Sequence, residues 1–211
     1  MLVYYFTSEE YGLINLENKH LKVSDFSNLN DPFELLGIEM SDKDVRAAVQ
    51  FEKSQIAKTK GLLCFSENKY DPVQWAHYGD SHKGVCLGFE IPETNLKQVN
   101  YVSSRLAKST LDDPNKHEKL LTTKFKHWAY EQERRLIVNL SSQISNGLVF
   151  EDFSADMTLK EIYIGCKSDL TFSDIQKKYE SDGEKVVIKH TRPAFKDFRI
   201  VWDKKKKSKH A

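Results

Sequence analysis

Short apolar runs of strand length recur along this chain, separated by polar segments and by stretches with helical spacing. A run of four to eight residues that is rich in aliphatic and aromatic side chains is typical of a β-strand. The pattern therefore predicts strands at 2–6, 21–23, 62–65, 85–91, 134–140, 147–151, 161–165, 185–189 and 198–202.

Four segments carry helix-start signals, in which a hydroxyl or carboxylate can accept hydrogen bonds from free amides of the first turn. Thr7 or Ser8 predicts a helix through residue 16, and Ser41 with Asp44 predicts one that continues to Gly61. Further helices are predicted from Asp113-Pro114 to Trp128 and from Ser173 to Glu180.

Strands outnumber helices in this pattern, and the two do not alternate as regular βαβ units. We therefore expect an α+β fold with a split, mainly antiparallel β-sheet core and flanking helices. A chain of 211 residues suits one domain of moderate size. We expect a single globular domain over residues 1–203, followed by a lysine-rich tail at 204–211.

Composition and charge narrow the class of protein. A hydrophobic content of 39% and a charged content of 30% are ordinary for a soluble globular protein. The apolar runs are too short to span a bilayer, and the first residues lack a signal-peptide pattern, so we expect a cytoplasmic protein with no membrane partner. Five of the last eight residues are lysines, and without them the formal charge falls from +1 to −4, so the folded part is not a basic nucleic-acid module.

The segment from Trp75 to Glu90 has the highest density of candidate chemistry. It contains Trp75, His77, Tyr78 and His82 together with two glycines, and it leads directly into an apolar strand. Glycines allow the backbone to approach a ligand closely, so the segment is a candidate site. The alternative is an ordinary half-buried helix end, where the same residue types are common.

Two further motifs have a local structural explanation beside a functional one. In Asn30-Asp31-Pro32, proline holds the preceding residue out of the helical region and the short polar side chains favour a turn, which would point Asn30 and Asp31 into a cleft. Glu131 and Glu133 lie at a predicted helix–strand junction, where strand geometry would place both carboxylates on one face. The alternative for these glutamates is a surface ion pair with the following arginines.

The sequence argues against a metal site and against a reactive cysteine. The separations between His77, His82 and Cys86 do not match structural zinc sites, and the apolar surroundings of Cys86 predict an inert thiol. We therefore expect no metal, and no disulfide among the three cysteines.

Several motifs in order resemble a widespread bacterial family of small proteins known as a domain of unknown function. They are Tyr4-x-Phe6, Leu29-Asn-Asp-Pro-Phe-Glu34, Cys64-Phe-Ser-Glu67, Trp75-Ala-His-Tyr-Gly-Asp-Ser-His-Lys-Gly-Val-Cys86, Trp128-Ala-Tyr-Glu-Gln-Glu-Arg134 and Glu161-Ile-Tyr-Ile-Gly165. The order of elements, with a late Glu-x-Glu, is more distantly similar to the ADP-ribosyltransferase fold, a split sheet that binds NAD in its cleft.

This second resemblance implies roles for particular residues. Glu133 would hold the nicotinamide ribose as the glycosidic bond breaks, Glu131 would deprotonate or orient the acceptor, and Tyr78 or Trp75 would stack on nicotinamide. The implied catalytic residues are Glu133, Glu131, Tyr78 and His77. The implied NAD-binding residues are Tyr4, Phe6, Asn30, Asp31, Trp75 and His82.

The same resemblance implies a toxin or phage-defence role, with a protein or nucleic acid as acceptor and an antitoxin or immunity protein as partner. Two other classes stay open. A nuclease acting on RNA or DNA would use His77 and His82 as acid and base, with Lys83 or Arg134 on the phosphate. A non-catalytic sensor would bind a nucleotide in the same aromatic cleft without turnover.

Overall fold

The computed structural model describes residues 1–26, 29–140, 144–145, 148–180, 183, 185–206 and 209–210. Within them, one large sheet has the strand order β13-β12-β11-β4-β1-β3-β8-β5, with β14 also paired to β12. Neighbouring strands are antiparallel except for β11 and β12. The strands are β1 (Leu2–Thr7), β3 (Lys60–Ser66), β4 (Val85–Glu90), β5 (Leu96–Gln98), β8 (Glu133–Asn139), β11 (Thr158–Ile164), β12 (Val187–Pro193), β13 (Ile200–Trp202) and β14 (Lys209–His210).

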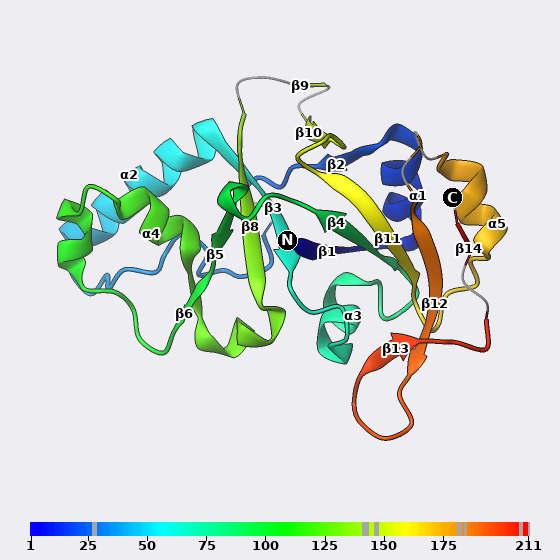
Figure 1. Ribbon diagram of the computed structural model, residues 1–211. Coiled ribbons are helices and arrows are strands. Elements are labelled where there is room, and N and C mark those ends of the chain that lie inside the picture. The colour runs from blue at the N-terminus through cyan, green and yellow to red at the C-terminus, as the bar shows by residue number, and fades with distance from the viewer. Residues whose placement is uncertain are drawn as a thin grey trace.

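The large sheet opens between two of its central strands. Strand β1 pairs with β4 over six residues, from Leu2 to Thr7, but pairs with β3 only through Tyr4 and Ser66. Strand β3 in turn pairs with β8 over its whole length. The sheet therefore has two halves, visible on either side of the N-terminus in Figure 1, that meet at one residue pair.

Helices cover both halves (Figure 1), and smaller sheets complete the fold. The helices are α1 (Glu9–Asn18), α2 (Lys43–Thr59), α3 (Pro72–Tyr78), α4 (Lys116–Thr122) and α5 (Phe172–Lys178), with 3₁₀ helices η1 (Glu93–Asn95), η2 (Lys108–Asp112) and η3 (Lys126–Glu131). The smaller sheets contain β2 (His20–Lys22), β9 (Ile144–Ser145) and β10 (Leu148–Asp152), and β6 (Asn100–Val102) with β7 (Thr123–Phe125).

The alternation of β1 divides its side chains between two cores. Val3 and Tyr5 pack in the core beneath α1 and α5, whereas Tyr4 and Phe6 pack on the opposite face with Trp75 of α3. A separate core lies beneath α2 and α4. No helix in the described part of the chain has the length and apolar character needed to cross a bilayer.

The mixed architecture and the largely antiparallel sheet confirm the coarse fold prediction, and the predicted strands are present with small shifts at their ends. The helix predicted from Asp113 to Trp128 was wrong in length, because α4 ends at Thr122 and the β-branched Thr123 starts β7. Cap positions differ in two helices. Asp42 rather than Ser41 caps α2, and Thr171 rather than Ser173 caps α5 in a capping box.

The lysine-rich C-terminal segment was predicted to be a solvated tail beyond the domain. Residues 209–210 instead form β14, which pairs with Val187 and Ile188 of β12. Lys207, Ser208 and Ala211 lie outside the described residues.

Candidate functional site

A cavity of about 380 Å³ lies where β1 and β3 diverge. Its wall is formed by β1 and β3, by α3, by the segment that leads to Glu34, and by β7, η3 and β8. The polar and charged residues of the wall include Asn30, Glu34, His77, Tyr78, Lys124, Glu131, Glu133 and Arg135. Segments that are far apart in sequence therefore meet at the opening of the sheet.

Helix α3, which the strand and helix patterns did not predict, positions one side of this cavity. Asp71 caps it by accepting hydrogen bonds from the amides of residues 73 and 74, and Pro72 occupies the first helical position. The buried Trp75 fixes the helix to the sheet, since its indole donates to the carbonyl of Lys69 at 2.8 Å and its ring contacts Phe6 edge-on. His77 and Tyr78 then face the cavity.

The turn after α3 requires an unusual backbone. Asp80, Ser81 and His82 all have left-handed φ angles, of 47°, 53° and 72°. A Cβ atom at Gly84 would lie 2.0 Å from the carbonyl oxygen of Thr7. The close approach predicted for this glycine is therefore to β1 and not to a ligand.

Glu131 and Glu133 converge on one lysine. Lys124 Nζ lies 2.5 Å from Glu131 Oε2 and 3.0 Å from Glu133 Oε2, and all three side chains are nearly inaccessible. Both carboxylates line the cavity, as expected, but the geometric reason differs from strand alternation. Glu131 ends η3 and Glu133 begins β8, and between them Gln132 adopts a left-handed conformation with φ of 44°.

Arg135 binds the Glu133 carboxylate and links it to Glu34, which follows the turn at Asn30. Its Nε donates to Glu133 Oε1 at 2.8 Å, and its two terminal nitrogens donate to the carboxylate of Glu34 at 2.5 and 3.0 Å. A further bond reaches the carbonyl of Leu121. Arg135 is 1% exposed, so the alternative of a surface ion pair with this arginine was wrong.

The two neighbouring carboxylates have opposite electrostatic environments. Burial opposes the charge of Glu133, but Arg135 and Lys124 outweigh it and lower the pKa of this carboxyl to about 2. Burial dominates at Glu131 and raises its pKa, despite the partial compensation from Lys124 and Tyr78. Glu133 is therefore a fixed anion, while Glu131 is the carboxyl better suited to exchange a proton.

Tyr78 connects Glu131 to the Asn30 turn. The Tyr78 hydroxyl donates to Glu131 Oε1 at 2.5 Å and accepts from the Asn30 amide at 2.8 Å. Burial and the adjacent carboxylate raise the pKa of Tyr78, so its hydroxyl stays protonated and remains a donor. Next to it, His77 Nδ1 lies 2.8 Å from the Tyr130 hydroxyl.

Of the other predicted binding residues, Tyr4 and Phe6 line the cavity, whereas three do not. Asp31 is buried in its own turn, where its carboxylate accepts from the amide of residue 33. Trp75 is 1% exposed and packed in a core, so stacking of its ring on a ligand was wrong. His82 lines a different cavity from His77, so these two histidines do not form one acid–base pair.

The site also contains three residues that sequence patterns did not single out: Glu34, Lys124 and Arg135. Glu34 ends the quoted Asn-Asp-Pro-Phe-Glu motif, and Arg135 follows two residues after Glu133 on the same strand face. No sequence pattern identified Lys124 as a site residue, because the predicted helix over residues 113–128 placed it on an ordinary helical surface.

Comparison with known proteins finds a match over one segment of the chain. Residues 74–136 match a family described as a protein of unknown function (DUF2971). This segment includes residues 74–78 of α3 and five residues of the cavity wall, Tyr78, Lys124, Glu131, Glu133 and Arg135. No curated protein and no solved structure matches the chain.

Proposed function

We propose that the cavity binds NAD and that the protein breaks the bond between nicotinamide and ribose, passing ADP-ribose to an acceptor. The proposal is carried by one observation, namely two adjacent carboxylates with opposite pKa shifts in a single cavity. Environments that separate the pKa values of two carboxyls assign them different roles in acid–base and electrostatic catalysis.

Glu133 supplies negative charge. Among the described residues, Glu133, Glu34 and Glu131 form side-chain ion pairs with two cations, Lys124 and Arg135, so this group of five, fully charged, has one excess negative charge. Such a group favours the positive charge that develops on the anomeric carbon as nicotinamide leaves. The resemblance implied that Glu133 hydrogen-bonds a ribose hydroxyl directly. Because Lys124 and Arg135 already bind this carboxylate, one of them must lose a hydrogen bond to Glu133 for that contact to form.

Glu131 is the group that we assign to proton transfer. The C1′–N bond breaks with its electron pair passing to the nicotinamide nitrogen, the acceptor lone pair forms the new bond to C1′, and Glu131 takes the acceptor proton. The Tyr78 hydrogen bond orients the carboxylate for this step. The reaction needs no oxidant or reductant.

The cavity has suitable shape and lining for the reacting half of the dinucleotide. Its volume of about 380 Å³ lies at the lower end of the range of small-molecule sites. Tyr78 and Phe6 present aromatic surface, while Asn30 and His77 present hydrogen-bonding groups. The divergence of β1 from β3 provides an opening of the kind found in split-sheet NAD-binding folds, which supports the ADP-ribosyltransferase interpretation.

The decisive experiment compares Glu131→Gln with the wild type for release of nicotinamide from NAD and for transfer of labelled ADP-ribose to cell extract. The substitution keeps the shape of the side chain and removes the proton acceptor, so we expect activity to fall about 100-fold or more. Glu118→Gln is the matched control, because Glu118 is an exposed glutamate paired with Lys97.

Three outcomes would contradict the proposal. Full activity in Glu131→Gln would remove the carboxylate from the mechanism. Binding of NAD without release of nicotinamide by the wild type would favour the nucleotide-binding sensor. Cleavage of RNA or DNA that ignores NAD would favour a nuclease. A toxin or phage-defence role follows only if expression of the active protein, and not of Glu131→Gln, arrests growth or limits infection.

A further inference from the structure

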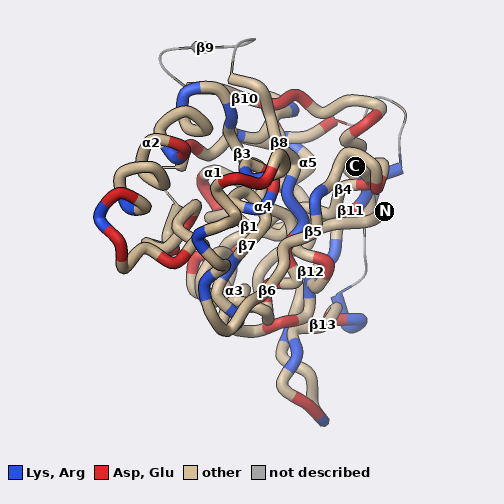
Figure 2. Tube along the Cα trace, turned by 90° about the vertical axis from the view of Figure 1, so that its left-hand side faces the viewer, with Lys and Arg blue, Asp and Glu red and all other residues tan. Residues whose placement is uncertain are grey.

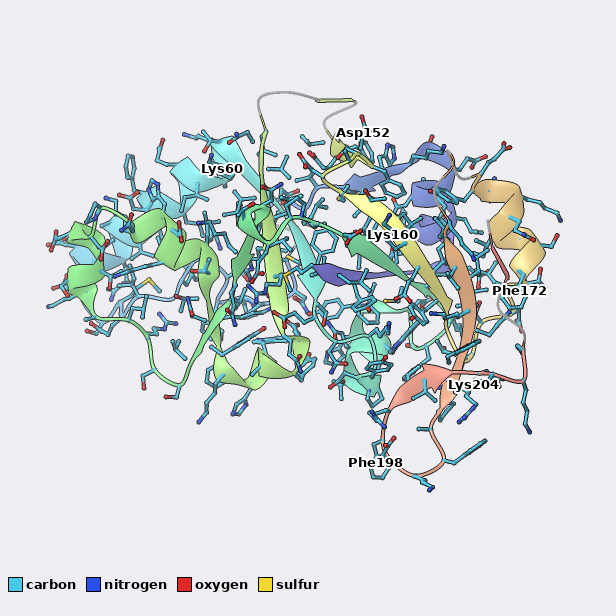
Figure 3. All side chains as sticks on the ribbon, in the orientation of Figure 1. Lys60, Asp152, Lys160, Phe172, Phe198 and Lys204 are labelled. Atoms are coloured by element: carbon cyan, nitrogen blue, oxygen red, sulfur yellow. The ribbon has the colours of Figure 1, made fainter. Side chains whose placement is uncertain are left out.

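A protruding hairpin presents two phenylalanines to solvent, and neither belongs to the cores described above. The segment between β12 and β13 extends away from the rest of the fold in Figures 1 and 2, and Phe198 lies at its outer end in Figure 3. Phe195 is 81% exposed and Phe198 is 97% exposed. Burying a phenylalanine stabilises a fold by about 1.5–3 kcal/mol, so these rings contribute little of that stabilisation where they are.

The hairpin belongs to a strongly basic part of an otherwise acidic chain. Residues 185–211 contain ten Lys or Arg and two Asp or Glu, whereas residues 1–184 contain 22 and 29. Arg192 lies over the Phe195 ring at 4.0 Å from its centroid. Arg199 follows the second ring and pairs with Asp197, which precedes it, and Lys196 lies one residue further back. Lys204, labelled in Figure 3, follows β13.

A cavity lies along the hairpin. Its volume is about 510 Å³, and it is lined by hairpin residues 193–200 together with Pro72, His82, Cys166 and Lys167. Phe195, Phe198, Lys196 and Arg199 therefore border the same concave surface. The hairpin is held in place at its base, where the amide of Ile200 donates to the carbonyl of Tyr70.

We propose that this hairpin and the basic residues beside it form a binding surface for single-stranded nucleic acid. Exposed aromatic rings stack on unpaired bases, and Lys and Arg side chains contact the phosphates, which is the combination by which proteins bind single strands without sequence preference. Residues 1–184 carry a formal charge of −7 and residues 185–211 one of +8, so contact with a polyanion is favoured at the C-terminal segment. The surface is separate from the NAD cavity, so the inference does not depend on the proposed function.

The test measures fluorescence anisotropy of labelled oligo(dT) and oligo(U) of about 20 nucleotides. We expect the wild type to bind at low salt with an affinity that falls as salt rises, because phosphate contacts release counterions. Replacing both rings in Phe195→Ala/Phe198→Ala should weaken binding about tenfold or more, since each stacked base contributes substantially. Lys196→Gln should weaken binding and reduce the salt dependence.

Phe51→Ala is the matched control, because Phe51 on α2 is also an exposed ring, at 60%, and lies outside the basic segment. Exposed rings contribute little to folding, so unchanged circular dichroism is expected for all of these variants. Absence of oligonucleotide binding by the folded wild type would overturn the proposal. It would also be overturned if the double variant bound the oligonucleotides as tightly as the wild type, or if the wild type bound a duplex of the same length as tightly as the single strand. Ring-dependent binding to phosphatidylserine vesicles but not to oligonucleotides would instead assign the hairpin to a membrane surface.

Discussion

Removing the negative charge of Glu133 should destabilise the fold, and the structure allows the size of the effect to be worked out. In Glu133→Gln, Arg135 keeps Glu34 and loses its other carboxylate partner, while Lys124 keeps only Glu131. The pKa of Glu133 is lowered from its ordinary 4.5 to about 2, chiefly because Arg135 and Lys124 overcome the cost of burial. Because a tenfold change in proton binding corresponds to about 1.4 kcal/mol, this shift corresponds to about 3 kcal/mol of stability.

The sign of the pH dependence follows from the lowered pKa. A carboxyl that is more acidic in the folded state contributes its full stabilisation above its unfolded pKa and loses it as the pH falls through the folded value. The difference between wild type and Glu133→Gln should therefore be largest near neutral pH. It should shrink as the pH falls from about 4.5 towards about 2.

Urea unfolding at a series of pH values measures this difference. Glu67→Gln is the matched control, because Glu67 pairs with Arg134, the neighbour of Arg135 on β8, at the surface. An exposed pair of this kind contributes less than about 1 kcal/mol. If Glu133→Gln were as stable as the wild type near pH 7, or less stable by an amount that did not vary with pH, the charge of Glu133 would not stabilise the fold through Arg135 and Lys124.

Three further predictions concern the cavity and the turn beside it. Tyr78→Phe removes a hydrogen bond that stabilises the Glu131 carboxylate. The acid limb of the pH–rate profile for nicotinamide release should therefore move to higher pH. An unmoved limb would show that Glu131 is not the titrating base. Lys124→Met should move that limb further in the same direction, because the cation is a stronger influence on the Glu131 pKa than the hydroxyl. Gly84→Ala should cost about 3 kcal/mol or more in thermal unfolding, since its Cβ would meet a backbone carbonyl, whereas Gly37→Ala meets only a side chain at 3.1 Å and should cost less.

Whereas β5, β6, β7, β9 and β14 were not predicted, the nine predicted strands were predictable because each depends on a local run of apolar residues that any sheet would bury. Strand β4, with five successive buried residues from Val85 to Phe89, is an example. Local pattern failed between Asp113 and Trp128, where a start signal and helix-compatible residues extended the prediction beyond Thr122. The chain leaves the helix there because β7 pairs with β6, a contact that no local window contains.

The candidate site was predictable only in part, for a related reason. Glu131, Glu133, Tyr78 and Asn30 were identified from motifs and from the resemblance, and all four line one cavity. The ion pair between Glu34 and Arg135 joins residues 101 positions apart, and it forms only because the fold brings β8 alongside the turn that follows Asn30. Without that partner, spacing alone assigned an ordinary surface role to the arginine.

The network explains why two glutamates separated by a single residue have different chemistry. Gln132 in a left-handed conformation turns the chain, so that Glu133 enters β8 beside Arg135 while Glu131 remains at the end of η3 beside Tyr78. The permanently charged guanidinium of Arg135 holds the Glu133 carboxylate ionised. The neutral hydroxyl of Tyr78 stabilises the charged form of Glu131 much less. Lys124 contacts both carboxylates, at 2.5 Å from Glu131 and 3.0 Å from Glu133, so the lower pKa of Glu133 comes from its other partner, Arg135. In the proposed reaction, proton transfer is therefore assigned to Glu131, and Glu133 keeps its charge throughout.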